Sequence, residues 1–126
     1  MSKLLIGNIE IKNPKFAITE KEQLNGLMFC AKKNPLMIFP YKAACKRHFW
    51  MKNVPIPLDI VFCCNGEIVN IRTGQPLSED LISSEAECDL VVEMSGGFCK
   101  ENNIVVGDVV KVKYDINSLK KLLTKN

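Results

Sequence analysis

Residues 58–72 read LDIVFCCNGEIVNIR, the clearest β-hairpin pattern in the chain. Two runs rich in β-branched and apolar residues, which favour strands, flank the Asn65-Gly66 pair. Asparagine and glycine tolerate the positive φ angles that a tight type I′ turn requires. The stretch therefore predicts a β-hairpin in which Val61 and Cys63 share one face of the first strand, because successive side chains alternate between faces.

Further short strands are expected on both sides of this hairpin. Apolar and polar residues alternate, or β-forming residues cluster, in six more runs: 5–11, 15–19, 36–39, 47–52, 89–94 and 109–114. The regular spacing of turn residues between these runs is typical of an all-β sandwich or barrel.

Helices are predicted to be short and few. Thr19 and Glu22 form a capping box, and Gly26 is expected to end the helix that they begin. A turn of helix is expected over 98–102. A last helix is expected over about 117–124, with its N-cap at the first of these residues.

Length and composition agree with one folded domain. The chain has 126 residues, of which 47% are hydrophobic and 25% charged, as is ordinary for a globular protein. We therefore expect a single domain over residues 1–126 that is mainly β, built as a compact barrel or jelly-roll-like sandwich with two or three short helices.

Charge is segregated along the chain, although the net charge is only +3. Residues 23–58 contain six Lys or Arg and no acid, a net of +6, whereas residues 59–108 contain ten acids and two basic residues, a net of −8. Two interpretations stay open. The two segments neutralise each other in the fold, or the basic segment forms a face for an acidic partner.

The composition argues against two classes of partner. Fifteen of the 17 basic residues are Lys rather than Arg, the residue suited to bidentate phosphate recognition, so there is no strong nucleic-acid signal. No apolar run is long enough to cross a membrane. The N-terminus lacks the apolar stretch of a signal peptide, which predicts a cytoplasmic location, or the virion if the chain is viral.

Six cysteines and a single histidine, His48, raise the questions of disulfides and metal binding. A cytoplasmic chain keeps its thiols reduced, so six free thiols are predicted. No C-x-x-C pair is present, and a tetrahedral zinc site needs four convergent ligands. The sequence therefore predicts no metal and no other cofactor.

The most distinctive motif is FWMKNVPIPLDI at residues 49–60. Four further motifs accompany it: T-x-x-E-Q-x-x-G-L-M at 19–28, LMIFP at 36–40, G-x-I-V at 66–69 and I-x-x-G-D at 104–108. Together, over about residues 15–112, the pattern resembles domain of unknown function family 192. The resemblance implies a compact β-barrel or jelly-roll-like sandwich, and it implies no established activity, substrate or cofactor.

Within the central motif, Trp50, Lys52, Asn53 and Asp59 are the candidate binding residues. Trp50 offers a flat stacking surface beside polar donors, as in sites for sugars, nucleobases or peptides. If Met51 points into the core, Trp50 and Lys52 point outward together. The alternative is architectural: Trp50 covers one end of the fold, and Asn53 and Asp59 hydrogen-bond to turn backbone.

The predicted function is that of a non-enzymatic domain, without catalytic residues, that binds an unidentified ligand or protein partner through the face around Trp50. Two alternatives stay open. One is a structural or assembly protein, such as a virion component, that associates with its own copies. The other is a hydrolase-type enzyme that uses His48, Asp59 or the thiolate of Cys45, which precedes two basic residues.

Overall fold

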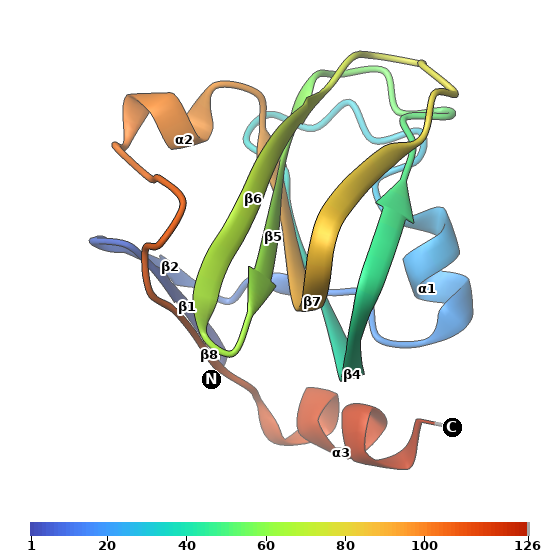
Figure 1. Cartoon of the computed structure of the whole chain (residues 1–126). Coiled ribbons are helices and arrows are strands. Elements are labelled where there is room, and N and C mark those ends of the chain that lie inside the picture. The colour runs from blue at the N-terminus through green and yellow to red at the C-terminus, as the bar shows by residue number, and fades with distance from the viewer. Residues whose placement is uncertain (126) are drawn as a thin grey trace.

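The computed structural model describes residues 1–125 and is mainly β, as the sequence predicts. Eight strands and three short helices follow one another along the chain (Figure 1). In chain order they are β1 Lys3–Ile6, β2 Ile9–Lys12, β3 Lys15–Phe16, α1 Glu20–Asn25, β4 Leu36–Phe49, β5 Leu58–Cys64, β6 Glu67–Gly74, β7 Ile82–Ser95, α2 Phe98–Glu101, β8 Val110–Lys113 and α3 Ile116–Thr124.

The strands form two sheets. A five-stranded sheet has the order β3-β4-β7-β5-β6, and a three-stranded sheet has the order β2-β1-β8. Backbone hydrogen bonds from Ile68 N to Asp108 O (3.0 Å) and from Val110 N to Gly66 O (2.8 Å) join β6 to the start of β8. The sheets do not close into a barrel, so the sandwich is the predicted architecture that the structure adopts.

The hairpin predicted from residues 58–72 forms β5 and β6 and is confirmed. Asn65 and Gly66 have φ angles of 51° and 80°, as a type I′ turn needs. Val61 and Cys63 lie in the same core cluster, on the face that they are predicted to share. A register shift after Phe62 marks a β-bulge, which increases the twist of the strand pair.

The five-stranded sheet is buried on both faces. One face packs against the three-stranded sheet and α2, with a core formed by Leu4, Ile6, Ile38, Val61, Cys63, Ile68, Val92, Met94, Cys99, Ile104 and Val110. The segment that includes α1 and the loop at 50–57 cover the other face (Figure 1), whose core is Ala17, Leu27, Phe39, Met51, Val54, Leu58, Ile60, Phe62, Ile82, Cys88 and Val91.

Two sequence predictions about strands are wrong. The sequence predicts separate strands at 36–39 and 47–52, but β4 runs without a break from Leu36 to Phe49. Register shifts against β7 let β4 continue through Pro40 and the polar residues that follow it. The run at 5–11 is two strands, because the chain turns at Gly7, with a φ of 56°, between β1 and β2.

The capping box of α1 and its end are confirmed. Thr19 Oγ1 accepts a hydrogen bond from Glu22 N at 3.1 Å, and Glu22 Oε1 accepts one from Thr19 N at 3.0 Å. The helix ends at Gly26, whose φ is 47°. The side chain of Glu22 also accepts a 2.7 Å hydrogen bond from Lys121 Nζ, which ties α1 to α3.

The other two helices lie close to their predicted positions. α2 falls within the predicted range of 98–102. The last helix begins at Ile116 rather than at residue 117, because Asp115 is its N-cap. The Asp115 carboxylate accepts hydrogen bonds from Ser118 N and Ser118 Oγ, both at 2.8 Å. Asp115 therefore takes the N-cap position that the sequence assigns to Asn117.

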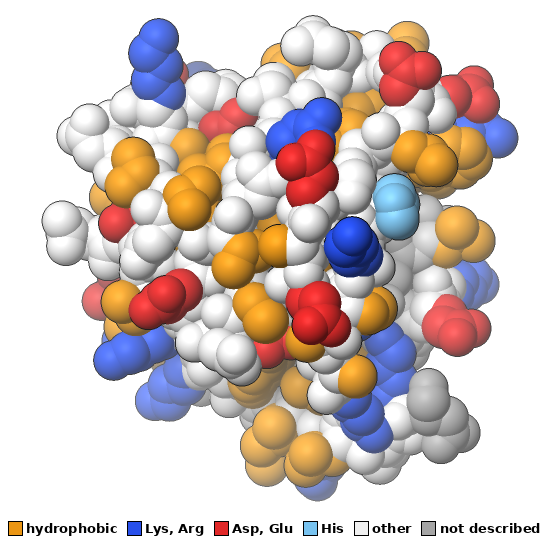
Figure 2. Space-filling model, in the orientation of Figure 1, with side chains coloured by type: hydrophobic (Ala, Val, Ile, Leu, Met, Phe, Trp, Pro, Cys, Tyr) orange, Lys and Arg blue, Asp and Glu red, His pale blue; other side chains and the backbone are white. Residues whose placement is uncertain are grey.

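The two oppositely charged segments lie in neighbouring strands. β4 belongs to the basic segment and pairs with β7 of the acidic segment, so that Lys46 lies directly opposite Glu87. No ion pair joins the two segments within residues 1–125, where the three ion pairs involve other residues. Acidic and basic side chains are interspersed over the face in Figure 2. In the described part of the chain, no helix has the length and apolar character needed to cross a membrane.

Candidate functional site

The central motif leaves β4 at Phe49 and crosses one end of the sandwich. Met51 is fully buried, whereas Trp50 and Lys52 are half-buried. The Lys52 ammonium lies 5.2 Å from the centre of the Trp50 ring, within the range of a cation–π contact. Residue 74 is a glycine because a Cβ there would collide with the side chain of Met51.

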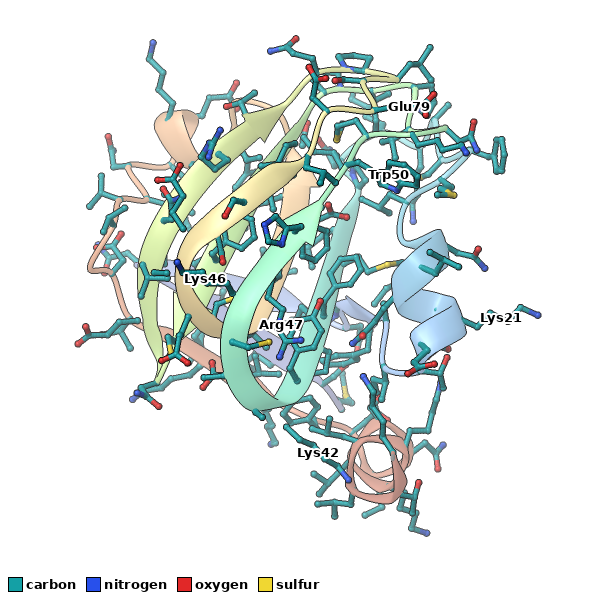
Figure 3. All side chains as sticks on the ribbon, turned by 45° about the vertical axis from the view of Figure 1, so that its right-hand side comes forward. Lys21, Lys42, Lys46, Arg47, Trp50 and Glu79 are labelled. Carbon is teal, nitrogen blue, oxygen red and sulfur yellow. The ribbon has the colours of Figure 1, made fainter. Side chains whose placement is uncertain are left out.

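A cavity opens beside Trp50, between α1 and the end of β4. Figure 3 shows Trp50 at that end of β4, whereas Lys42 lies midway along the strand, beside α3. We call it the Trp50 cavity; its volume is about 320 Å³, and it is lined by Glu20, Gln23, Leu24, Asn25, Gly26, Leu27, Met28, Phe39, Tyr41, His48, Phe49, Trp50, Lys52, Val54 and Glu93.

Aromatic side chains form much of the cavity wall. The rings of Phe39 and Phe49 meet edge to face, with centroids 5.2 Å apart and an interplanar angle of 86°. The guanidinium of Arg47 lies over the ring of Tyr41, 3.6 Å from its centre, in a cation–π contact. Burial raises the pKa of Tyr41, so its hydroxyl stays neutral at physiological pH.

The carboxyl group of Glu93 is the one acid of the wall that is buried. Alternation along β7 puts Glu93 on the same face as Val91, and its cross-strand neighbours are Met37 and Ile60. Only 4% of the residue is exposed, and burial alone raises its pKa to about 8. Within residues 1–125 its carboxyl has no hydrogen bond and no ion pair.

Glu93 is not among the residues that the sequence singles out. The available signal was a single acid inside the apolar run at 90–94, which lies in a strand expected to be buried. The alternation of that strand predicts which residues share its face, but not which loops cover the face. The cavity could therefore not be located from the strand pattern.

Two of the four predicted site residues lie elsewhere. Asp59 is 5% exposed and caps α2: its carboxylate accepts hydrogen bonds from Gly97 N at 3.1 Å and from Cys99 N at 2.9 Å. Asn53 does not line the cavity; its backbone carbonyl accepts a 2.6 Å hydrogen bond from Phe29 N. Asp59 therefore holds turn backbone, as in the architectural alternative, and the cavity retains Trp50 and Lys52.

The residues of the hydrolase alternative do not converge. His48 lines the Trp50 cavity, but Asp59 and Cys45 do not. Cys45 is exposed on β4, opposite Cys88, and burial raises the pKa of Cys88 to about 11. All six cysteines are thiols, and no group of three His, Cys, Asp or Glu side chains within residues 1–125 is placed to hold a metal ion.

A second cavity, of about 360 Å³, shares Gly26 and Leu27 with the Trp50 cavity. It lies against β2 and β3, and its charged lining residues are Lys12, Lys15 and Lys32, all exposed. It has no buried charged group and no aromatic wall. The Trp50 cavity is therefore the stronger candidate for a specific site.

Solved structures share this fold. A protein of unknown function from Novosphingobium aromaticivorans DSM 12444 has a TM-score of 0.79 and 29% identity, over 87% of this chain and 82% of that one. A Sinorhizobium meliloti 1021 protein, provisionally described as a transcription regulator, has a TM-score of 0.77 and 25% identity, over 88% and 91%. No curated protein matches. Residues 7–112 match the uncharacterized ACR family DUF192, and the chain therefore belongs to that family.

Proposed function

We propose that this domain binds a small organic molecule in the Trp50 cavity and does not transform it. One observation carries the proposal: Glu93 lines an aromatic-walled cavity although the residue as a whole is 96% buried, and its carboxyl has no hydrogen-bond or ion-pair partner within residues 1–125. Burying an acid without a partner is costly, and glutamate is rarely buried that fully. A bound molecule would supply the missing partner.

The cavity has the general properties of a small-molecule site. Such sites measure roughly 300–1,000 Å³ and combine apolar walls with a few polar groups that fix orientation. At about 320 Å³ the Trp50 cavity is at the lower end of that range. Its polar groups, among them Glu93, His48 and Lys52, lie among aromatic and aliphatic side chains.

The lining also supports binding without catalysis. No Ser, Thr or Cys lines the cavity, so the usual hydroxyl and thiol nucleophiles are absent from it. His48 has no hydrogen-bonded acid to orient it among residues 1–125, whereas an acid–base site needs such a pair. Binding is therefore the activity that these residues support best.

A fragment screen by ligand-observed NMR tests the proposal with wild-type protein, Trp50→Ala and Lys46→Ala. Lys46 is exposed on β4, the strand that leads into Trp50, and it lines neither the Trp50 cavity nor the second cavity. It is therefore the matched control. We expect fragments that bind the wild type and Lys46→Ala, and that bind Trp50→Ala at least tenfold more weakly.

The melting temperature of Trp50→Ala must be measured alongside, because a fall of more than about 10 °C would mean that Trp50 is a core residue and the motif architectural. Fragments that bind Trp50→Ala unchanged would contradict the proposed site. If no fragment binds and light scattering shows a mass that grows with concentration, the assembly function replaces the proposal.

A further inference from the structure

We propose that the ligand of the Trp50 cavity is a primary ammonium compound with an apolar body, whose ammonium group pairs with the carboxylate of Glu93. This inference rests on the proposed function and names the chemical class of its ligand. It follows from which groups of the cavity already have partners and which do not.

Glu93 is the deep polar group that lacks a partner. The Gln23 amide is fully engaged: its Nε2 donates to Ala17 O at 3.0 Å and to Pro40 O at 3.1 Å, and its Oε1 accepts from Lys125 Nζ. No lysine or arginine lies within 4.0 Å of the Glu93 carboxyl in residues 1–125. A ligand that carries both a positive charge and N–H donors supplies what is missing.

The walls suit the rest of such a molecule. Phe39, Phe49 and Trp50 present aromatic surface to the cavity, and aromatic rings attract both apolar groups and organic cations. Trp50 already stacks with the Lys52 ammonium at the mouth, 5.2 Å from the ring centre. The same ring chemistry is available to an ammonium ligand inside.

Other ligand classes fit less well. A metal ion needs several oxygen, nitrogen or sulfur ligands, and no group of three such acids, histidines or cysteines lies together in the described chain. A carboxylate or phosphate ligand would be repelled by the ionised form of Glu93, and it has no N–H donor for the carboxylate to accept from. The remaining competitor is a neutral ligand whose carbonyl oxygen accepts a hydrogen bond from the protonated carboxyl.

The pH dependence of binding separates the ammonium ligand from this competitor. The other titratable groups that face the cavity are Glu20 from α1, Tyr41 and His48 from β4, and Lys52 from the loop. From β5, Leu58, Ile60 and Phe62 face this side and carry no charge. Because all of these groups are unchanged in a Glu93→Gln variant, any difference in pH dependence belongs to Glu93.

Burial raises the pKa of Glu93 to about 8, so the empty site holds a proton at pH 7. Pairing with an ammonium group stabilises the carboxylate, and that proton leaves to the buffer. Ammonium affinity should therefore rise about tenfold from pH 6 to 7 and about fivefold from pH 7 to 8, where half of the empty sites have already lost the proton. A neutral ligand that accepts from the protonated acid should instead lose affinity above pH 8.

Isothermal titration calorimetry with benzylamine, benzyl alcohol and benzoate tests the inference, because the three share one carbon skeleton. Trp50 is the only tryptophan of the chain, so its fluorescence reports whether binding occurs at this cavity. We expect benzylamine to bind at least tenfold more tightly than the other two, with release of close to one proton at pH 7. Glu93→Gln should lose this preference, whereas Glu87→Gln, an exposed change on β7, should keep it.

Equal or tighter binding of benzyl alcohol or benzoate would overturn the ammonium inference but leave the proposed function intact. Benzylamine binding that is unchanged in Glu93→Gln would overturn it as well. If none of the three compounds, and no fragment of the wider screen, changes Trp50 fluorescence, both the inference and the proposed function fail.

Discussion

At Glu93, a carboxyl group lies among apolar side chains of the sheet, and no basic side chain of residues 1–125 forms an ion pair with it. Its effect on folding is opposite to that of Glu22, whose hydrogen bond to Lys121 lowers the pKa of the Glu22 carboxyl to about 2. Glu22 therefore favours the folded state at neutral pH, whereas an ionised Glu93 opposes it. This contrast makes Glu93 a residue that folding alone does not explain.

The buried carboxyl of Glu93 should make the free energy of unfolding depend on pH. Its pKa is about 8 in the folded state, against 4.5 for an ordinary glutamate. Below pH 4.5 the Glu93 carboxyl holds its proton in both the folded and the unfolded state. Between pH 4.5 and 8 only the unfolded chain loses this proton. The free energy of unfolding therefore falls as the pH rises, by up to roughly 1.4 kcal/mol per pH unit. Above about pH 8 this contribution is constant.

Urea denaturation at pH 5, 6, 7 and 8 measures this effect in wild type, Glu93→Gln and Glu87→Gln. We expect the wild type and Glu87→Gln to lose stability over this range more steeply than Glu93→Gln, which should be the most stable of the three at pH 8. Parallel pH profiles for all three proteins would show that the Glu93 carboxyl is not buried in solution.

The residues of the site were predictable to different degrees. Trp50 and Lys52 can be singled out from the sequence because they stand in a distinctive motif and alternate with a core methionine, and both line the cavity. For Asp59, from the same motif, the sequence leaves a binding role and a backbone-capping role open, because the partners Gly97 and Cys99 lie about forty residues away along the chain. Glu93 was missed because its importance depends on the loops that cover it.

Among the elements, α2 depends most visibly on a distant residue. The helix spans only Phe98–Glu101, and no side chain of its own N-cap residue, Gly97, can satisfy its first amides. Asp59 of β5 provides both hydrogen bonds instead. The helix is therefore held by the sheet rather than by its own sequence.

Replacement of Asp59 should weaken this connection without affecting ligand binding. Asp59→Ala leaves two amides near the helix start unsatisfied, and the expected loss is about 1–3 kcal/mol of unfolding free energy. Asp59→Asn, which keeps one acceptor oxygen, should lose less. Chemical denaturation measures both variants; a loss below about 0.5 kcal/mol for Asp59→Ala, or a loss of fragment binding in a folded variant, would contradict the capping role.

Elements set by local sequence were predicted well, and those set by distant pairing were not. The capping box of α1 and the turn at Asn65-Gly66 need only a few neighbouring residues, and both are present as predicted. The continuity of β4 depends on its partner β7, which supports the strand across Pro40 through the pairing of Pro40 with Leu90, 50 residues later. The sequence pattern therefore indicates β-structure only at the two ends of this strand.

At the scale of the whole molecule, two sheets bury three of the six cysteines. Cys63, Cys88 and Cys99 are buried, and burial raises the pKa of Cys99 to about 12, so these thiols are unreactive in the folded state. We expect a thiol reagent to modify exposed Cys45 first in native protein, and all six thiols after denaturation without reductant. A total below six would reveal a disulfide and contradict the predicted free thiols.

The described chain has other cavities besides the Trp50 cavity, and the proposed function requires that ligands bind in the Trp50 cavity and not in the second cavity beside it. The sequence gives no means to rank them, because each is closed by loops that meet only in the fold. The two cavities share part of their walls at Gly26 and Leu27. Only residues that line one cavity and not the other can therefore show where a ligand binds.

A ¹H–¹⁵N NMR titration with the tightest fragment of the screen answers this directly. We expect the largest shifts on the Trp50 indole N–H and on the backbone amides of Asn25 and Glu93, residues that border only the Trp50 cavity. Shifts that gather instead on Lys12 and Asn34, which border the second cavity, or that spread without a centre, would contradict the claim that the Trp50 cavity is the ligand site.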